Sequence, residues 1–145
     1  MKLLTRDTDY ALRALVFISS RKGRIVSVSE LVRCLKIPRP FLRKLLQILT
    51  KKKILISVRG SCGGFILKAP DGDIRLPDIM RVFQGAFSLN ECVFKKHICP
   101  NHRRCVLREK IISIEQYLLK ELNRITLKDI VPWGHGDKKK DKKHR

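Results

Sequence analysis

Apolar residues recur at spacings of three and four along the first part of the chain, a period that predicts amphipathic helices. The first apolar face consists of Tyr10, Ala11, Ala14, Leu15 and Ile18. Thr5 stands before this face, where a hydroxyl can cap a helix N-terminus, and Gly23 ends the pattern. A capping box at residues 27–30 opens a second helix with Leu31 and Cys34 on its inner side. We therefore expect two packed helices and a buried thiol at Cys34.

A third helix is predicted to begin at Pro40, because proline in the first helical turn lacks only an N–H that would have no partner there. Its core-facing positions are Phe41, Leu42, Leu45, Leu46 and Leu49. Its opposite face carries Arg39, Arg43, Lys44, Gln47 and Lys51. Two helices joined by a short turn, the second with a basic and amide-bearing face, are typical of a helix-turn-helix that reads bases in a major groove. An ordinary solvated helix would show the same pattern.

The next segment shifts the balance toward DNA binding. Residues 54–59 and 65–68 are β-rich runs on either side of a glycine-rich turn, so they predict a hairpin. A hairpin directly after a helix-turn-helix is a wing. Arg59 and Gly60 lie where the hairpin turns, and arginine at such a tip can enter a minor groove. Residues 74–76 are expected to add a short strand to the wing sheet.

The last helix carries more apolar surface than a lone surface helix needs. Pro77 starts a preceding helix that Gly85 ends. The last helix has its apolar stripe at Leu107, Ile111, Ile112, Ile114, Leu118, Leu119, Leu122 and Ile125. A stripe of this width is expected to pack against a twofold partner.

The charge of the chain points to a polyanionic partner. Net charge is +20, from 33 lysines and arginines against 13 acidic residues. Only six of those basic residues fall in the last ten positions, so the folded part is itself basic. Such an excess favours nucleic acid over a merely solvated basic surface. The first twenty residues include Asp7, Asp9 and Arg13, which argues against a secretory signal or a membrane span and for a reducing cytoplasm.

Three cysteines cluster on one short segment. Cys92, Cys99 and Cys105 are separated by six and five residues, so a loop must bring them together. Thiolates suit zinc or the irons of a cluster, and the basic residues around them favour the thiolate form. Three ordinary cysteines, or a disulfide with one thiol left over, are the alternatives. His97 and His102 lie inside the same segment and are further candidate ligands.

The order of these parts resembles the Rrf family of bacterial winged-helix regulators over roughly residues 1 to 130. The motifs that carry the resemblance are residues 4–5 and 8–13, the turn 37–42, the wing residues 58–60 and 63–64, the three cysteines, and residues 125–130. Two features of the sequence depart from the pattern of the family. The first cysteine gap is one residue longer than is common, and Cys62 stands where the wing usually has glycine.

This resemblance implies a homodimeric transcription factor with an iron-sulfur cluster near the dimer interface, of two or four irons. The matching ligand positions are Cys92, Cys99 and Cys105. IscR-like members add a histidine at the position of Arg108, whereas NsrR-like members add an aspartate from the partner's first helix, which matches Asp9. The resemblance therefore favours Asp9 as fourth ligand, with His97 and His102 as rivals.

The expected fold class is mostly α with a small β-hairpin wing, a winged helix-turn-helix followed by a long C-terminal dimerisation helix. Its parts are a DNA-binding domain at 1–86, a cysteine cluster loop at 87–106, a dimerisation helix and closing segment at 107–130, and a basic disordered tail at 131–145. The expected DNA-binding residues are Arg39, Pro40, Arg43, Lys44, Gln47, Arg59 and Gly60.

The expected function is a cytoplasmic repressor that binds promoter DNA as a homodimer under the control of an iron-sulfur cluster. We expect no enzyme activity, because the sequence has no nucleotide-binding glycine motif and no paired acid-base or nucleophile arrangement. No small-molecule substrate is expected either. Three alternatives remain open. They are a constitutive regulator with a structural zinc site, a thiol sensor without metal, and a redox enzyme or electron carrier.

Overall fold

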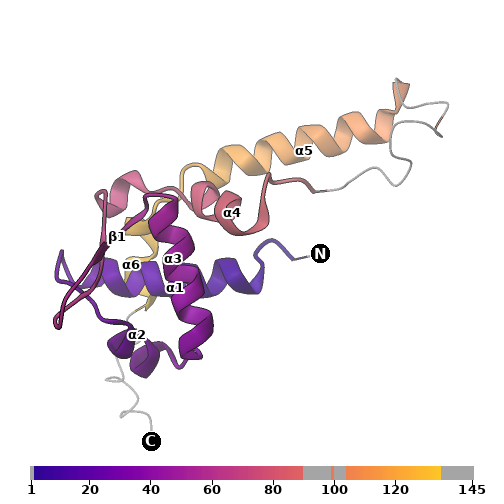
Figure 1. Cartoon of the computed structure of the whole chain (residues 1–145). Coiled ribbons are helices and arrows are strands. Elements are labelled where there is room, and N and C mark those ends of the chain that lie inside the picture. The colour runs from indigo at the N-terminus through magenta and orange to yellow at the C-terminus, as the bar shows by residue number, and fades with distance from the viewer. Residues whose placement is uncertain (1, 90–98, 100–103, 135–145) are drawn as a thin grey trace, which may run out of the picture.

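The computed structural model describes residues 2–89, 99 and 104–134 and consists of helices arranged around α1, with one small hairpin at the side (Figure 1). The elements in chain order are α1 (Arg6–Ser20), α2 (Val28–Leu35), α3 (Arg39–Lys51), β1 (Leu55–Val58), β2 (Gly64–Leu67), the short 3-10 helix η1 (Asp71–Asp73), α4 (Leu76–Gln84), α5 (Val106–Leu122) and α6 (Leu127–Gly134). This arrangement confirms a mostly helical fold with a two-stranded wing.

The core surrounds α1 because every helix of the body lays an apolar face on it or on its neighbours. Thr5 caps α1 as predicted, since its hydroxyl accepts the Thr8 N–H at 3.3 Å. The largest fully buried side chains include Leu15, Leu31, Leu42, Leu46, Leu49, Ile79 and Leu127. The prediction for Cys34 was wrong, because this thiol is exposed. The interior at that end of α2 is filled instead by Ile37, which is 3% exposed.

The helix-turn-helix consists of α2 and α3, joined by a tight turn. Lys36 caps the end of α2 in the left-handed conformation, and its N–H donates to the Val32 carbonyl at 2.9 Å. Pro38 precedes α3, and Pro40 falls in its first turn as the sequence predicts. The turn therefore takes only three residues, and α3 packs against α2.

The wing is an antiparallel hairpin in which Leu55 pairs with Leu67 and Val58 with Gly64. A third segment joins it, because Val26 and Phe65 exchange backbone hydrogen bonds of 3.0 and 2.8 Å. The prediction that residues 74–76 extend this sheet was wrong. Val26 already occupies the β2 edge, and Arg75 forms an isolated bridge with Thr126 instead.

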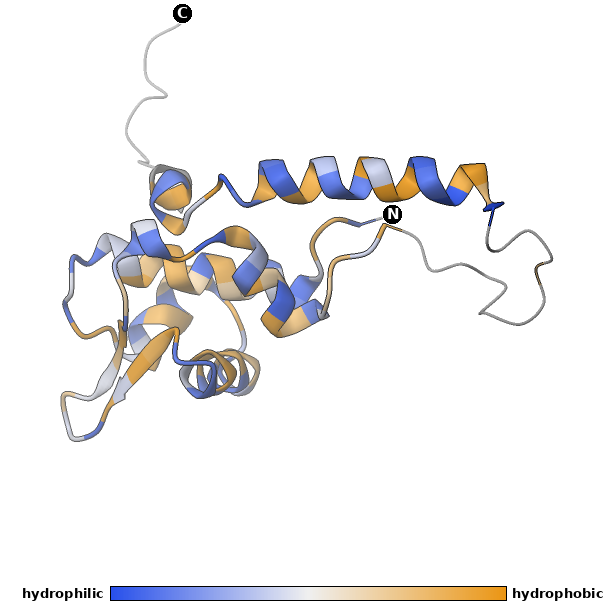
Figure 2. Cartoon of the chain, turned by 90° about the horizontal axis from the view of Figure 1, so that it is seen from above, coloured by the Kyte–Doolittle hydropathy of each residue, from blue (hydrophilic) through white to orange (hydrophobic). Residues whose placement is uncertain are grey.

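The chain leaves the body at Gly85, whose φ of 77° ends α4 as predicted. In Figure 1, α5 extends away from the body, and Figure 2 shows apolar residues along its length. Much of one face of this helix is open to solvent, with Val106 66%, Leu107 69% and Tyr117 67% exposed. Its last turn joins the core through Leu122.

After α5 the chain returns to the body, and α6 packs against α1. This last helix runs to Gly134, so the first residues of the predicted tail are helical, and the rest of the tail lies outside the described residues. No helix in the described part of the chain combines the length and apolar character needed to cross a membrane.

Candidate nucleic-acid interface

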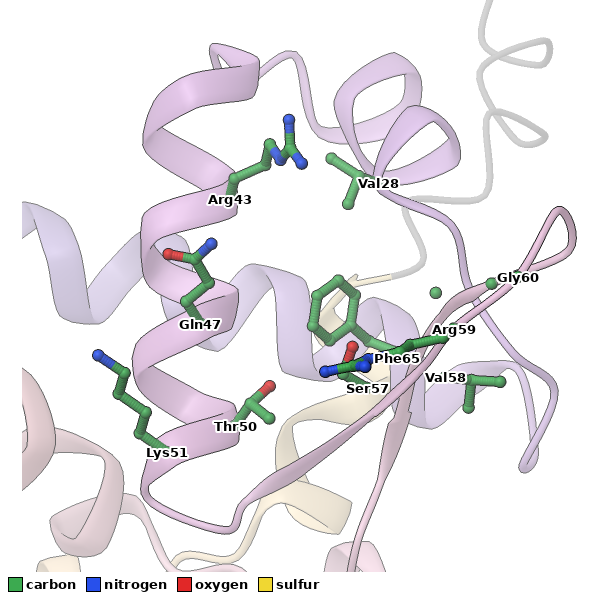
Figure 3. Close-up of a pocket in the computed structure, with 12 residues that line it drawn as sticks. Val28, Arg43, Gln47, Thr50, Lys51, Ser57, Val58, Arg59, Gly60 and Phe65 are labelled. Atoms are coloured by element: carbon green, nitrogen blue, oxygen red, sulfur yellow. The ribbon is translucent and has the colours of Figure 1, made fainter.

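An open groove of about 550 Å³ separates α3 from the hairpin (Figure 3). Its lining consists of Val28, Arg43, Gln47, Thr50, Lys51, Ser57, Val58, Arg59, Gly60, Gly63, Gly64 and Phe65. Gln47 and Lys51 come from α3, and the Arg59 side chain comes from the hairpin, beside Phe65 (Figure 3). The groove therefore has cationic and amide groups on its helix side, a guanidinium on its hairpin side and an aromatic ring between them.

Within the described residues, the cations of this groove have no carboxylate partners. Arg43, Lys51 and Arg59 are exposed, and the ion pairs of the described residues involve other arginines, those at positions 13, 21, 24 and 124. An unpaired cation on a concave basic surface attracts phosphate strongly, because no protein anion competes for it.

The predicted DNA-binding residues divide into two groups. Arg43, Gln47, Arg59 and Gly60 line the groove. Arg39, Pro40 and Lys44 are exposed on α3 but do not line it. Arg39 also donates a hydrogen bond of 2.7 Å to the Ser29 hydroxyl, which ties the first turn of α3 to α2.

Other groove residues were not predicted as DNA-binding. Lys51 was placed on the basic face of this helix together with Gln47, four residues earlier, but was not included among the expected DNA-binding residues. Val28, Ser57 and Phe65 gave no such signal, because their place in the groove depends on how α2 and the hairpin pack.

Two glycines fix the shape of the hairpin side. A Cβ on Gly63 would lie 2.5 Å from the Val58 carbonyl oxygen, and one on Gly64 would lie 2.7 Å from the Val26 carbonyl carbon. Both obstacles are backbone atoms that cannot rotate away. The close approach of Gly64 to Val26 is also what lets Val26 pair with Phe65, so these glycines set the position of the wing.

The described part of the cysteine segment lies at the start of α5. Cys105 is the N-cap of α5, and its sulfur accepts a hydrogen bond from the Arg108 backbone N–H at 3.4 Å. Cys99 and Cys105 are free and partly exposed. Cys92, His97 and His102 lie outside the described residues.

Asp9 stands on the first turns of α1, where its carboxylate pairs with Arg13 at 2.9 Å. Within the described residues of a single chain, no three histidine, cysteine or acidic side chains gather as a metal site. The proposed set of Cys92, Cys99, Cys105 and Asp9 is therefore not assembled by the described part of one chain.

Comparison with known proteins decides the family. The sequence pattern of the Rrf2 family, described as an iron-dependent transcriptional regulator, matches residues 4–132. The chain belongs to the Rrf2 family. A relative from Aquifex aeolicus (strain VF5), which bears the name of an HTH-type transcriptional regulator, is 32% identical over 124 residues, covering 84% of this chain and 86% of the relative.

Solved structures of Rrf2-type regulators share the fold. CymR, titled the global cysteine regulator of B. subtilis, superposes with a TM-score of 0.75 at 22% identity, covering 92% of this chain and 98% of CymR. IscR of T. potens gives a TM-score of 0.70 at 23% identity, covering 93% of this chain and 89% of that protein. These structures show the winged-helix fold, and the family match identifies the chain as a transcriptional regulator rather than an enzyme.

Proposed function

We propose that the chain is a cytoplasmic homodimeric repressor that binds promoter DNA through α3 and the wing, under the control of an iron-sulfur cluster. The observation that carries the DNA contact is the groove whose cations, Arg43, Lys51 and Arg59, have no carboxylate partner in the described chain. The cluster control is supported by the iron-dependent description of the family together with the three cysteines.

On DNA, the two sides of the groove take different roles. Arg43 and Gln47 lie one helical turn apart on α3, so both can face one stretch of major groove, where arginine pairs with guanine and glutamine with adenine. Arg59 on the hairpin reaches toward the backbone or the adjacent minor groove. The helix would then read sequence while the wing senses groove shape.

The described cysteines fit an iron-sulfur cluster. Cys99 and Cys105 are free thiols with some solvent access, and Cys105 is the N-cap residue of α5. Cys92, Cys99 and Cys105 would hold the cluster, with Asp9 of a second copy as fourth ligand. When bound, the cluster supplies a centre that responds to oxidants, nitric oxide or iron supply.

Cys105 lies where binding of a cluster at its sulfur would change the structure of α5. Its sulfur accepts the Arg108 N–H, so a change at this sulfur alters the first turn of α5 directly. The exposed apolar residues of that helix, Val106, Leu107, Ile114 and Tyr117, are the surface proposed to pack against the partner. A shift of this surface would change the distance between the two α3 helices of the dimer, which must contact DNA half-sites at a fixed spacing.

A second candidate is a sensor that uses thiols without metal. The similarity to a regulator titled for cysteine control favours it, and so do the exposed free thiols Cys34 and Cys62. Reversible disulfide formation that changes DNA affinity in an iron-free sample would establish this candidate. A structural zinc site would instead give a colourless protein with bound zinc and constant DNA affinity.

The ligand set can be tested in protein purified without oxygen, by visible absorption with iron and sulfide content. We expect Cys92→Ser, Cys99→Ser and Cys105→Ser each to remove the absorption, and Cys62→Ser to retain it. Asp9→Ala should shorten the lifetime of the cluster in air. Because Asp9→Ala also breaks the pair with Arg13, Arg13→Ala is the matched control and should behave as wild type.

The opposite pattern would overturn this ligand set. If Asp9→Ala keeps the wild-type spectrum and lifetime while His97→Ala or His102→Ala loses them, the fourth ligand is a loop histidine. If all three cysteine variants keep the absorption of the wild type, the cysteine segment does not hold the cluster.

A further inference from the structure

Three residues other than glycine have a positive φ in the described part of the chain, and all three are lysines. They are Lys22 at 49°, Lys36 at 55° and Lys53 at 60°. In this left-handed region a side chain crowds the neighbouring carbonyl, so glycine is the usual occupant and asparagine the next best. Residues in this region persist where the surrounding structure fixes their backbone, and they are enriched at functional sites.

Two of these lysines lie on either side of α3. Lys36 ends α2 three positions before α3 begins, and Lys53 comes two positions after α3 ends. Backbone hydrogen bonds hold both turns, because the Lys36 N–H donates to Val32 at 2.9 Å and the Lys53 N–H to Thr50 at 3.0 Å. Both side chains are exposed, and neither forms an ion pair within the described residues.

The length of α3 can be compared with the width of the major groove of DNA. Its 13 residues extend about 20 Å at the helical rise of 1.5 Å per residue. The major groove of B-DNA is roughly 12 Å wide, so when the middle of a helix of this length lies in the groove, its two ends extend toward the phosphates that border it. The turns that carry Lys36 and Lys53 would then lie beside the phosphates of the two DNA strands.

We propose that Lys36 and Lys53 bind DNA phosphates on the two opposite strands and so fix the seat of α3 in the major groove. The proposal rests on the contact of α3 with DNA stated above and adds to it two residues outside the groove. A phosphate contact is independent of base sequence, so the pair positions the helix and leaves reading to Arg43 and Gln47. Glycine would suit the positive φ at each site better, but glycine has no charged side chain to bind a phosphate.

Glycine substitution separates this role from a structural one. Lys36→Gly and Lys53→Gly remove the charge while relieving the backbone, so their thermal unfolding midpoints should equal or exceed that of the wild type. Lys22→Gly is the matched control, since it makes the same change at a turn after α1. The probe is a mixed-sequence DNA duplex of about three helical turns, titrated over a series of salt concentrations.

We expect Lys36→Gly and Lys53→Gly to bind this duplex several-fold more weakly. The slope of log affinity against log salt concentration should be less steep by about 0.9 for each phosphate that is no longer neutralised. Lys22→Gly should bind as wild type, and Lys36→Arg and Lys53→Arg should retain binding. Asparagine at each position serves as a second neutral variant in case a glycine variant fails to fold.

Two results would overturn the proposal. One is an unchanged salt dependence in Lys36→Gly and Lys53→Gly, and the other is an equal loss in all three glycine variants, which would reflect net charge alone. A wild-type protein that does not bind the duplex at all would instead contradict the DNA contact of α3 itself.

Discussion

The hydroxyl of Thr8 donates a hydrogen bond of 2.9 Å to the side-chain oxygen of Gln84, a residue 76 positions later. Thr8 is completely buried. The same Gln84 oxygen accepts the Thr5 N–H at 3.2 Å, and its amide nitrogen donates to the Leu3 carbonyl at 3.0 Å. One side chain thus joins the start of α1 to the end of α4, next to Gly85, where the chain departs toward the cysteine segment.

Removing either partner should destabilise the fold through this junction. Thr8→Val keeps the shape but removes the buried hydroxyl, and Gln84→Leu removes the bonds to Thr5, Thr8 and Leu3 at once. We expect each to lower the free energy of unfolding by about 1–3 kcal/mol, measured by urea denaturation. Gln116→Leu, at an exposed position of α5 outside its apolar face, is the control and should change this free energy little.

The double variant sharpens this test. Because Thr8 and Gln84 contribute to the same bond, Thr8→Val combined with Gln84→Leu should cost less than the sum of the single changes. Strict additivity would show that the two side chains act independently.

A methyl group at Gly64 should disturb the wing. Its Cβ would collide with the Val26 carbonyl, which is backbone, so Gly64→Ala must displace either β2 or the segment that pairs with it. We expect a loss of about 1–3 kcal/mol in unfolding free energy, together with weaker DNA binding. Gly72→Ala is the control, since its nearest neighbour would be the flexible Lys128 side chain at 3.9 Å. Equal stability of the two variants would contradict the tight fit.

The exposed face of α5 should determine the oligomeric state. Leu107 and Tyr117 are 69% and 67% exposed in the single chain, although both are large and apolar. Leu107→Glu combined with Tyr117→Glu is expected to convert a dimer into a monomer in analytical ultracentrifugation. Gln116→Glu adds a charge on the same helix and should leave the dimer intact. A wild-type protein that is monomeric at high concentration would exclude this face as the interface.

The start of α6 should lose stability in acid. Hydrogen bonds from the Thr126 hydroxyl and backbone N–H, at 2.7 and 2.8 Å, hold the pKa of Asp129 below its ordinary value of 3.8. A carboxyl whose pKa is lowered on folding stabilises the fold above its unfolded pKa, and this contribution is lost as pH falls through the folded value. The contribution should therefore be complete at neutral pH and decline only below about pH 4.

Comparison of Asp129→Asn with wild type isolates this contribution. The variant should be less stable than wild type at neutral pH, and the difference should shrink as the pH falls below 3.8. Asp78→Asn on α4 is the control, because its carboxylate makes no hydrogen bond within the described residues. A difference between Asp129→Asn and wild type that stays constant down to about pH 2 would contradict this role.

The sequence pattern predicts those parts of the fold that depend on local chemistry. Capping at Thr5, the proline-led start of α3, the glycine-turned hairpin and the stop at Gly85 follow from neighbouring residues, and the structure confirms them. The bridge from Arg75 to Thr126 and the pairing of Val26 with Phe65 were not predicted, because both join segments far apart in the chain.

The residues of the DNA-binding groove also divide into those that local sequence predicts and those that it does not. Arg43 and Gln47 could be predicted because they share a helix face, and Arg59 because it adjoins the hairpin turn. Phe65 and Ser57 reach the groove only through the packing of the hairpin against α3, which no local spacing encodes. Helical spacing likewise placed Cys34 inside, whereas Cys34 is exposed and Ile37, three positions later, is buried.

If a cluster held by the loop cysteines controls DNA affinity, removing its metal must change how the protein binds promoter DNA, and one titration measures this. The protein would be purified without oxygen, assayed for iron, sulfide and visible absorption, and titrated against promoter DNA before and after its metal is removed by a chelator. We expect a brown, iron- and sulfide-containing dimer whose DNA affinity changes when the cluster is lost. A colourless protein that binds the DNA equally well with and without the chelator would contradict it.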